Sequence, residues 1–201
     1  MTFGGILNTT MPKSITETLA KATAGDWQTM DSLVPAVYAE LKAIASSYLH
    51  GDRAHTLQPT ALVHEAFLKM VGNDRGWSGQ DHFKAVAAKA MRQVLVDYAR
   101  ARNSDKRGGG RRKASISVDG FASPGQTGET REMQIEELDQ LLVLLAEVSP
   151  RMAQVAELRL FGGMETDQIA RVSGSSLKMV QRDWQLARAW LAGKVRERSG
   201  G

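Results

Sequence analysis

Apolar residues recur at three- and four-residue spacing along most of this chain, which is the period of helices that bury one face. A capping box begins at Ser14 and ends at Glu17, and Pro59 suits the first turn of a later helix. A longer helix is expected from about residue 81 to 102. The positions expected to be buried are Met30, Leu33, Val34, Val37, Leu41, Ile44, Ala45, Tyr48, Leu62, Val63, Ala66, Phe67, Met70, Phe83, Val86, Ala87, Ala90, Met91, Val94, Leu95 and Tyr98.

Residues 104–130 interrupt this pattern. They contain a glycine triplet at 108–110 and no sustained apolar period, which predicts a flexible linker. Helical periodicity resumes near Glu132, and strand-like alternation persists nowhere. We therefore expect an all-α protein of two small helical domains, residues 14–103 and 131–198, joined by the linker. The buried positions expected in the second domain include Ile135, Leu138, Leu141, Leu142, Leu145, Val155, Leu158 and Phe161, with a break at Ser149-Pro150 and a stop at Gly162-Gly163.

A helix-turn-helix pattern lies in residues 165–192. A short helix at 166–172 leads into a turn around Gly174 and a second helix with one apolar and one basic face. Such a second helix enters the major groove, where Gln and Arg reach base edges and Lys and Arg hold phosphates. An ordinary amphipathic hairpin is the alternative. The expected buried stripe is Leu177, Val180, Trp184, Ala187 and Leu191, with Trp190 also packing, and the DNA-contact candidates are Ser176, Lys178, Met179, Gln181, Arg182, Gln185 and Arg188.

The net charge of +4 is distributed in blocks along the 201 residues. Residues 1–99 are neutral, residues 100–113 carry seven basic and one acidic group, residues 114–175 are net −6, and residues 176–201 are net +4. Positive charge thus follows the 81–102 helix and covers the second helix of the helix-turn-helix. A Gly-rich basic tail can follow phosphates without reading sequence, or it can serve only as a soluble linker.

Several function classes are disfavoured. The chain has no Cys, so it has no disulfides, thiolate zinc site or Cys nucleophile, and no apolar run approaches the ~20 residues of a membrane span. His64-Glu65 lacks the second His of a zinc-protease motif, and His50 and His55 have no ligand partners nearby in sequence. No signal peptide is visible. We expect a soluble cytoplasmic protein without enzymatic activity, metal, cofactor, small-molecule substrate or membrane insertion.

In their order and spacing, these features resemble the extracytoplasmic-function (ECF) sigma factors of bacterial RNA polymerase over residues 14–198. The sequence LVHEAFL at 62–68 resembles the polymerase-binding helix of that family. MRQVLVDYAR at 91–100 resembles the helix that reads and melts the minus-ten promoter element. Residues 169–176 and VQRDW at 180–184 resemble the reader of the minus-thirty-five element.

The resemblance implies an alternative sigma factor that binds core polymerase and directs promoter-specific initiation. Its polymerase contacts, on the clamp helices of the largest subunit, would come from the 59–70 helix, and a loop at 72–80 would hold a base flipped out of the non-template strand. Tyr98 has the alternative role of closing the core. The implied polymerase-binding residues are Leu62, Glu65, Phe67 and Leu68, and the implied minus-ten residues are Asn73, Arg75, Trp77, Lys89, Arg92, Tyr98, Arg100 and Arg102.

The sequence departs from the family at two places. The acidic cluster that usually opens the polymerase-binding helix is replaced by Gln58-Pro59-Thr60-Ala61, so docking is expected to be weaker. Phosphorylation of Thr60 by a Ser/Thr kinase would restore negative charge, whereas a plain helix-start role for Thr60 is the alternative. An anti-sigma factor is the other regulator that the resemblance allows. Ser173 and Ser175 replace apolar residues and are expected to loosen the helix-turn-helix.

Two other functions remain open from the residues alone. One is a helix-turn-helix regulator with a helical effector-binding domain, which would bind a palindrome as a dimer. The other is an enzyme or RNA-binding protein that uses the Gly/Arg tail. The linker composition favours mobile domains, but contact between the acidic 132–147 segment and basic surfaces of the first domain would close the molecule.

Overall fold

A computed structural model describes residues 38–39, 41–46, 58–71, 79–104, 115–117 and 132–199. Helices dominate these residues, which confirms the all-α class; residues 41–46 are also helical. The Ser14 capping box, the minus-ten candidates Asn73, Arg75 and Trp77, and the basic residues in 105–113 lie outside the described residues. The elements are α3 (Pro59–Val71), α4 (Gln80–Ser104), β1 (Ser115–Ser117), β2 (Glu132–Gln134), α5 (Ile135–Val148), α6 (Pro150–Gly162), α7 (Thr166–Ser173) and α8 (Leu177–Ser199).

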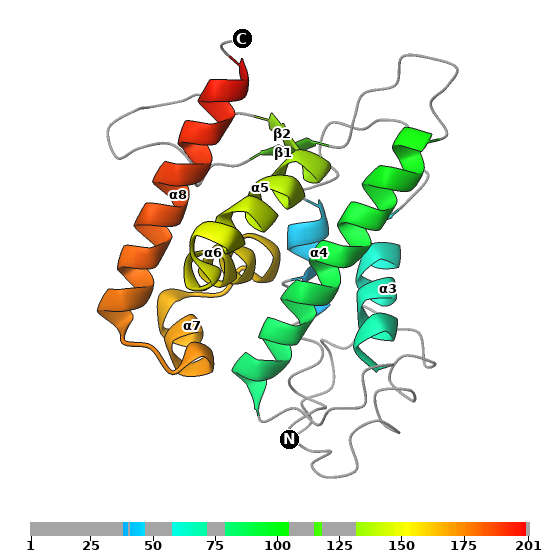
Figure 1. Cartoon of the computed structure of the whole chain (residues 1–201). Coiled ribbons are helices and arrows are strands. Elements are labelled where there is room, and N and C mark those ends of the chain that lie inside the picture. Colours follow the sequence, from blue (N-terminus) through cyan, green and yellow to red (C-terminus); the bar gives the residue numbers. More distant parts are fainter. Residues whose placement is uncertain are drawn as a thin grey trace, which may run out of the picture.

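Helix α4 lies at the centre of the arrangement, with α3 on one side and α6 on the other (Figure 1). Helices α5 and α7 also contact α4, and α8 packs on α6. One hydrophobic core therefore runs through both predicted domains. Phe67 of α3 and Phe83 of α4 meet with ring centroids 5.9 Å apart, and Phe161 of α6 is fully buried in the same core.

The two short strands are a departure from the expected irregular linker. β1 and β2 pair in antiparallel register, with Ile116 opposite Met133. The extended backbone at 132–134 moves the start of α5 to Ile135, three residues later than the sequence pattern indicated. This pairing places residues 115–117, within the predicted linker, beside residues 132–134, which follow it.

The helix ends follow the chemistry expected from the sequence. Ser149 has extended backbone (φ −157°) and its Oγ accepts a hydrogen bond from the amide of Met152, which begins α6 at Pro150. Gly163 ends α6 in the left-handed conformation (φ 57°). At Gly162 a Cβ atom would lie 2.8 Å from the Cβ of Ala88, so α4 and α6 approach more closely here than a larger residue allows.

The predicted buried positions that the structure describes are buried or partly buried, with two corrections in α8. Five others lie outside the described residues: Met30, Leu33, Val34, Val37 and Tyr48. Leu177 is 53 % exposed, because it is the first residue of the helix and lies outside the packed stripe. Asp183 occupies the stripe instead and is 2 % exposed, since it lies between Val180 and Ala187 on the face that meets α6. In the other predicted helices the buried set includes Leu62, Phe67, Met91, Leu95, Ile135, Leu138, Leu141, Leu142, Leu145, Val155, Leu158 and Phe161, and Val86 and Tyr98 are partly buried against it.

Candidate nucleic-acid and polymerase interface

Helices α7 and α8 are joined by a tight turn at the predicted position. Gly174 ends α7 with φ 65°, a conformation that favours glycine, and the amide of Ser175 donates to the carbonyl of Ala170. Ser176 Oγ accepts from the amide of Met179 at 3.3 Å and begins α8. Ser173 Oγ donates to the Ile169 carbonyl at 2.7 Å. Ser173, through its side chain, and Ser175, through its backbone amide, thus both hydrogen-bond to carbonyl groups of α7.

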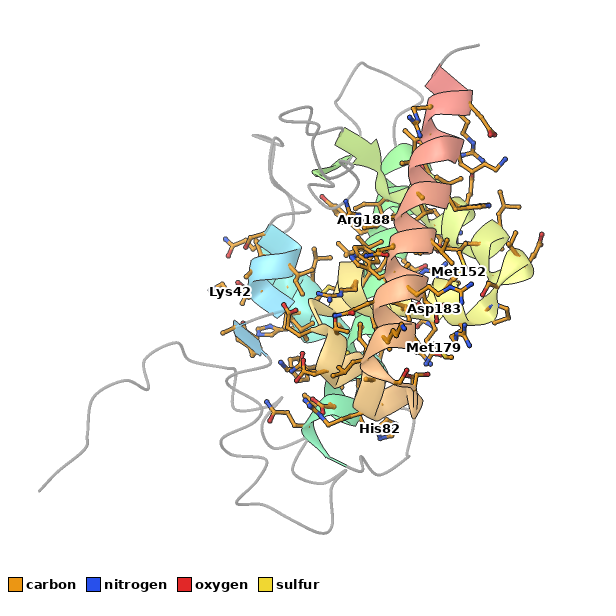
Figure 2. All side chains as sticks on the ribbon, turned by 90° about the vertical axis from the view of Figure 1, so that its left-hand side faces the viewer. Lys42, His82, Met152, Met179, Asp183 and Arg188 are labelled. Carbon is orange, nitrogen blue, oxygen red and sulfur yellow. The ribbon has the colours of Figure 1, made fainter. Side chains whose placement is uncertain are left out.

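Most of the DNA-contact candidates on α8 share one exposed face. Met179 lies on the first turn of this helix, and Asp183 follows it one turn further along (Figure 2). Arg188 differs from the rest: it is partly buried, with its guanidinium 5.8 Å from the centre of the Trp184 ring. The exposed candidates are Ser176, Lys178, Met179, Gln181, Arg182 and Gln185.

Trp184 is a packing residue, as predicted. Two guanidinium groups lie near the centre of its ring, that of Arg159 from α6 at 5.9 Å and that of Arg188 at 5.8 Å. Arg159 also bonds Glu165 at 3.1 Å and the hydroxyl of Thr166. The cation–π contact of Arg159 thus joins α6 to α8, and the hydrogen bonds of the same side chain join α6 to the start of α7.

The ion pair between Arg151 of α6 and Asp183 of α8 was not predicted. Arg151 Nε donates to Asp183 Oδ2 at 2.5 Å and its second nitrogen donates to Oδ1 at 3.0 Å. This hydrogen bond to Asp183 raises the pKa of Arg151 above its ordinary value. The available signal was an acidic residue in register with the apolar stripe, three residues after Val180 and four before Ala187.

The minus-ten candidates on α4 differ in how far their side chains are exposed to solvent. Lys89 and Arg100 are exposed, Tyr98 is partly buried against the core, and Arg92 has only 19 % of its side chain exposed. The packing of Tyr98 favours the alternative in which it closes the core. The side chain of Arg102 is outside the described residues, as are Asn73, Arg75 and Trp77.

A groove of about 370 Å³ runs beside Arg92 between α4 and the helices α5 and α6. Both basic and acidic side chains line it, and Lys69 and Asp97 form an ion pair of 2.6 Å at its edge. The lining residues are Lys69, Lys89, Arg92, Gln93, Val96, Asp97, Arg100, Asp139 and Glu157.

The polymerase-binding candidates on α3 divide into two pairs. Leu62 and Phe67 are fully buried, so their role in this structure is to hold α3 in the core rather than to provide surface contacts. Glu65 is exposed and Leu68 is 56 % exposed. A partner that approaches this helix from solvent would therefore meet Glu65 and Leu68.

A polar cluster lies at the start of α3. The hydroxyl of Tyr38 is 3.2 Å from His64 Nε2. Burial raises the pKa of Tyr38, and a hydrogen bond to the Thr60 side chain partly opposes that rise. Burial also lowers the pKa of His64 below its ordinary value of 6.5. The side chain of Thr60 is thus part of this cluster and is half-buried.

Among residues 38–39, 41–46, 58–71, 79–104 and 132–199, no group of three His, Asp or Glu side chains could hold a metal ion. No described helix is long and apolar enough to cross a membrane.

Two helices joined by a tight glycine turn, with a basic exposed face on the second, are typical of helix-turn-helix DNA-binding proteins. The family model described as "ECF sigma factor" matches residues 12–197, and the chain belongs to that family. Its class is therefore that of the alternative sigma factors, which are DNA-binding transcription factors that act in initiation. No curated protein and no solved structure gave a significant match.

Proposed function

We propose that this chain binds core RNA polymerase in the cytoplasm and directs it to specific promoters. The observation that carries the proposal is the exposed, basic and amide-rich face of α8, presented by the turn at Gly174. That face lies in a chain whose family acts in transcription initiation.

Reading of the minus-thirty-five element is assigned to the first half of α8. Arg182 has the donor fork that suits the O6 and N7 atoms of guanine, and Gln181 and Gln185 suit adenine edges. Lys178, near the helix start, is placed to neutralise a phosphate and so to set the register on the duplex. Met179 and Ser176 flank these side chains on the same exposed surface.

Minus-ten recognition is assigned to α4 and the loop before it. Lys89, Arg92 and Arg100 would follow the opening strands, with Arg102 at the helix end. The loop residues Asn73, Arg75 and Trp77 have the chemistry to stack on and bond to a flipped base. The basic residues Arg111, Arg112 and Lys113 would add contacts to phosphates that carry no sequence information.

Docking on the polymerase is assigned to α3. Leu68 provides an exposed apolar side chain and Glu65 a neighbouring charge, which suits a helix packed on the clamp helices of the largest subunit. The buried residues Leu62 and Phe67 would support this surface from beneath. Of the four residues of α3 that the sequence indicated for polymerase binding, only Glu65 and Leu68 would then contact the polymerase directly.

Regulation through Thr60 is part of the proposal. A phosphate there, added by a Ser/Thr kinase, would bring about −1.5 to −2 charges to the start of a helix that has no acidic residue in its first turn. Phosphorylation would also displace the Thr60 hydroxyl from Tyr38. A Thr60→Ala protein that transcribes as well as wild type under inducing conditions would exclude this regulation, and an anti-sigma factor would then be the remaining type of regulator.

The proposal is tested by binding to core polymerase and to DNA together. Purified protein should elute with core polymerase in gel filtration, and the complex should shift genomic DNA fragments that neither component shifts alone at the same salt concentration. A protein that does not bind core polymerase but shifts a palindromic fragment as a dimer would instead be a helix-turn-helix regulator.

A further inference from the structure

All three guanidinium nitrogens of Arg92, a minus-ten candidate, donate to acidic side chains from the other half of the chain. Its Nε and one terminal nitrogen donate to Asp139 Oδ1 of α5 at 2.9 and 2.7 Å. Its other terminal nitrogen donates to Glu157 Oε1 of α6 at 3.0 Å. The exposed fractions are only 19 % for Arg92, 17 % for Asp139 and 15 % for Glu157, so this cluster is largely removed from solvent.

Two further contacts of the same kind join the halves. Arg100, about two turns further along α4 than Arg92, donates to Asp139 Oδ2 at 3.3 Å. At the other end of α4, Asp81 accepts from Arg171 of α7 at 2.6 Å. Between these ends, Gly162 of α6 lies against Ala88 of α4 with no room for a side chain. The contact between the halves is therefore both close-packed and charge-matched along α4.

This closed arrangement limits how far apart two DNA elements can be reached. Helices α4 and α8 both pack on α6, and packed helix axes lie about 8–10 Å apart, so the axes of α4 and α8 are separated by at most about 20 Å where they cross α6. Minus-ten and minus-thirty-five elements are about 25 base pairs apart, or about 85 Å at 3.4 Å per base pair. The closed molecule cannot place α4 on one element and α8 on the other.

We propose that Asp139 and Glu157 form an autoinhibitory contact, an acidic latch that occupies Arg92 in place of DNA phosphates and keeps the free protein closed. Opening would release Arg92 and Arg100 together and separate α4 from the α5–α8 helices. The masking of DNA contacts rests on the proposed function, but the closure itself does not.

The test uses the full chain with Asp139→Asn and Glu157→Gln, which keep the shape of both side chains and remove their charge. The matched control is Glu147→Gln with Glu197→Gln, which removes the same charge from exposed positions on α5 and α8. Because the chain has no Cys, spin labels can be attached at Ala61→Cys and Ala146→Cys, two exposed sites in opposite halves. Pulsed electron paramagnetic resonance then measures the distance between the halves without polymerase or promoter.

The latch predicts a single short distance for wild type and for the control. For the latch variant it predicts a population at longer distances that rises by about tenfold or more, since loss of buried ion-pair partners destabilises the closed state. An unchanged distance distribution in the latch variant would overturn the proposal. Circular dichroism checks folding, and if the double variant is not helical, Glu157→Gln alone replaces it with the same two outcomes.

DNA binding by the unlabelled free protein tests the masking. With a labelled duplex of mixed sequence, the latch variant should bind more tightly than the charge-matched control, and its log–log salt slope should steepen by about 1–2 as Arg92 and Arg100 reach phosphates. A variant that opens but binds DNA no better than the control would show that Arg92 is not masked. If transcription assays fail while the distances still change, the latch stands and the proposed function alone is at fault.

Discussion

The carboxylate of Asp183, buried in the second turn of α8, accepts two hydrogen bonds from the guanidinium of Arg151 at the start of α6. Two parallel bonds fix a side chain in orientation as well as position. Because Asp183 lies on the face of α8 that meets α6, the pair sets which residues of α8 point to solvent. Arg182, the next residue back along the helix, is consequently directed away from the core.

Loss of this pair should lower stability. Arg151→Ala leaves the carboxylate of Asp183, only 3 % exposed, without its partner. We expect the Tm to fall by about 5 °C, because a buried polar group that loses its hydrogen bonds is costly in a chain of this size. Arg182→Ala, at an exposed site one residue from Asp183, should leave the Tm within about 1 °C of wild type. Equal melting of both variants would show that the pair contributes nothing.

Two glycines should respond to alanine in opposite directions. Gly162→Ala places a methyl group 2.8 Å from the Cβ of Ala88, and the overpacking should cost about 1–3 kcal/mol in the free energy of unfolding. Gly193→Ala in α8 meets nothing within 4 Å and should add about 0.5–1 kcal/mol, because alanine favours the helix. Urea denaturation measures both. A neutral Gly162→Ala would mean that α4 and α6 do not approach as closely as described.

The sequence predicted these helices well because each signal was local. Pro59, Ser149 and Gly174 act on the backbone within one turn of themselves, and the apolar period determines which face is buried. The cross-helix pairs were beyond this kind of reasoning. Nothing in the spacing of Arg151 and Asp183, or of Arg92 and Asp139, indicates which acid meets which base until the helices pack.

In the candidate site, too, local features could be predicted from the sequence, whereas features that depend on how the helices pack could not. The exposed face of α8 could be predicted from periodicity, except that Leu177 and Asp183 exchange roles at the helix start and in the stripe. On α3 the apolar pattern correctly placed Leu62 and Phe67 on the buried face, but that burial leaves only Glu65 and Leu68 at the surface for a partner. A family motif does not by itself separate the residues that support a surface from those that form it.

Stability should depend on pH through His64. Burial lowers the pKa of His64 in the folded protein below 6.5, so the unfolded chain takes up the proton first as the pH falls. The contribution of neutral His64 is present above about pH 6.5 and is lost as the pH falls from there toward the lower folded pKa. The Tm of wild type should drop over that range, and His64→Gln should flatten the drop. His82→Gln is the control, and an equal effect from it would remove the assignment to His64.

Surface and buried positions on α3 should separate polymerase binding from folding. Leu68→Asp, at an exposed site, should weaken binding to core polymerase about tenfold or more with little change in the Tm. Leu62→Ala should instead cost about 2–5 kcal/mol of stability, since Leu62 is fully buried. Fluorescence titration with core polymerase and thermal melting give the two readouts. A Leu68→Asp protein that binds core polymerase normally would place the docking surface elsewhere.

Promoter choice should depend on Arg182. Arg182→Ala should weaken binding to the preferred promoters by about 1–3 kcal/mol, and transcription from them should fall accordingly. It should also relax the preference at one base pair of the minus-thirty-five element. Lys178→Ala should weaken binding to all sequences alike and lower the salt slope by about 1. Selection of bound sequences from a random pool distinguishes them. Unchanged base preference with Arg182→Ala would show that α8 reads DNA through other side chains.

Run-off transcription with purified core polymerase, with and without this protein, tests the central claim most directly. Promoter-directed initiation predicts transcripts with defined start sites on a subset of genomic fragments, present only when the protein is added. The absence of any promoter-dependent transcript, on fragments that cover the genome and with the protein shown to be folded, would contradict it.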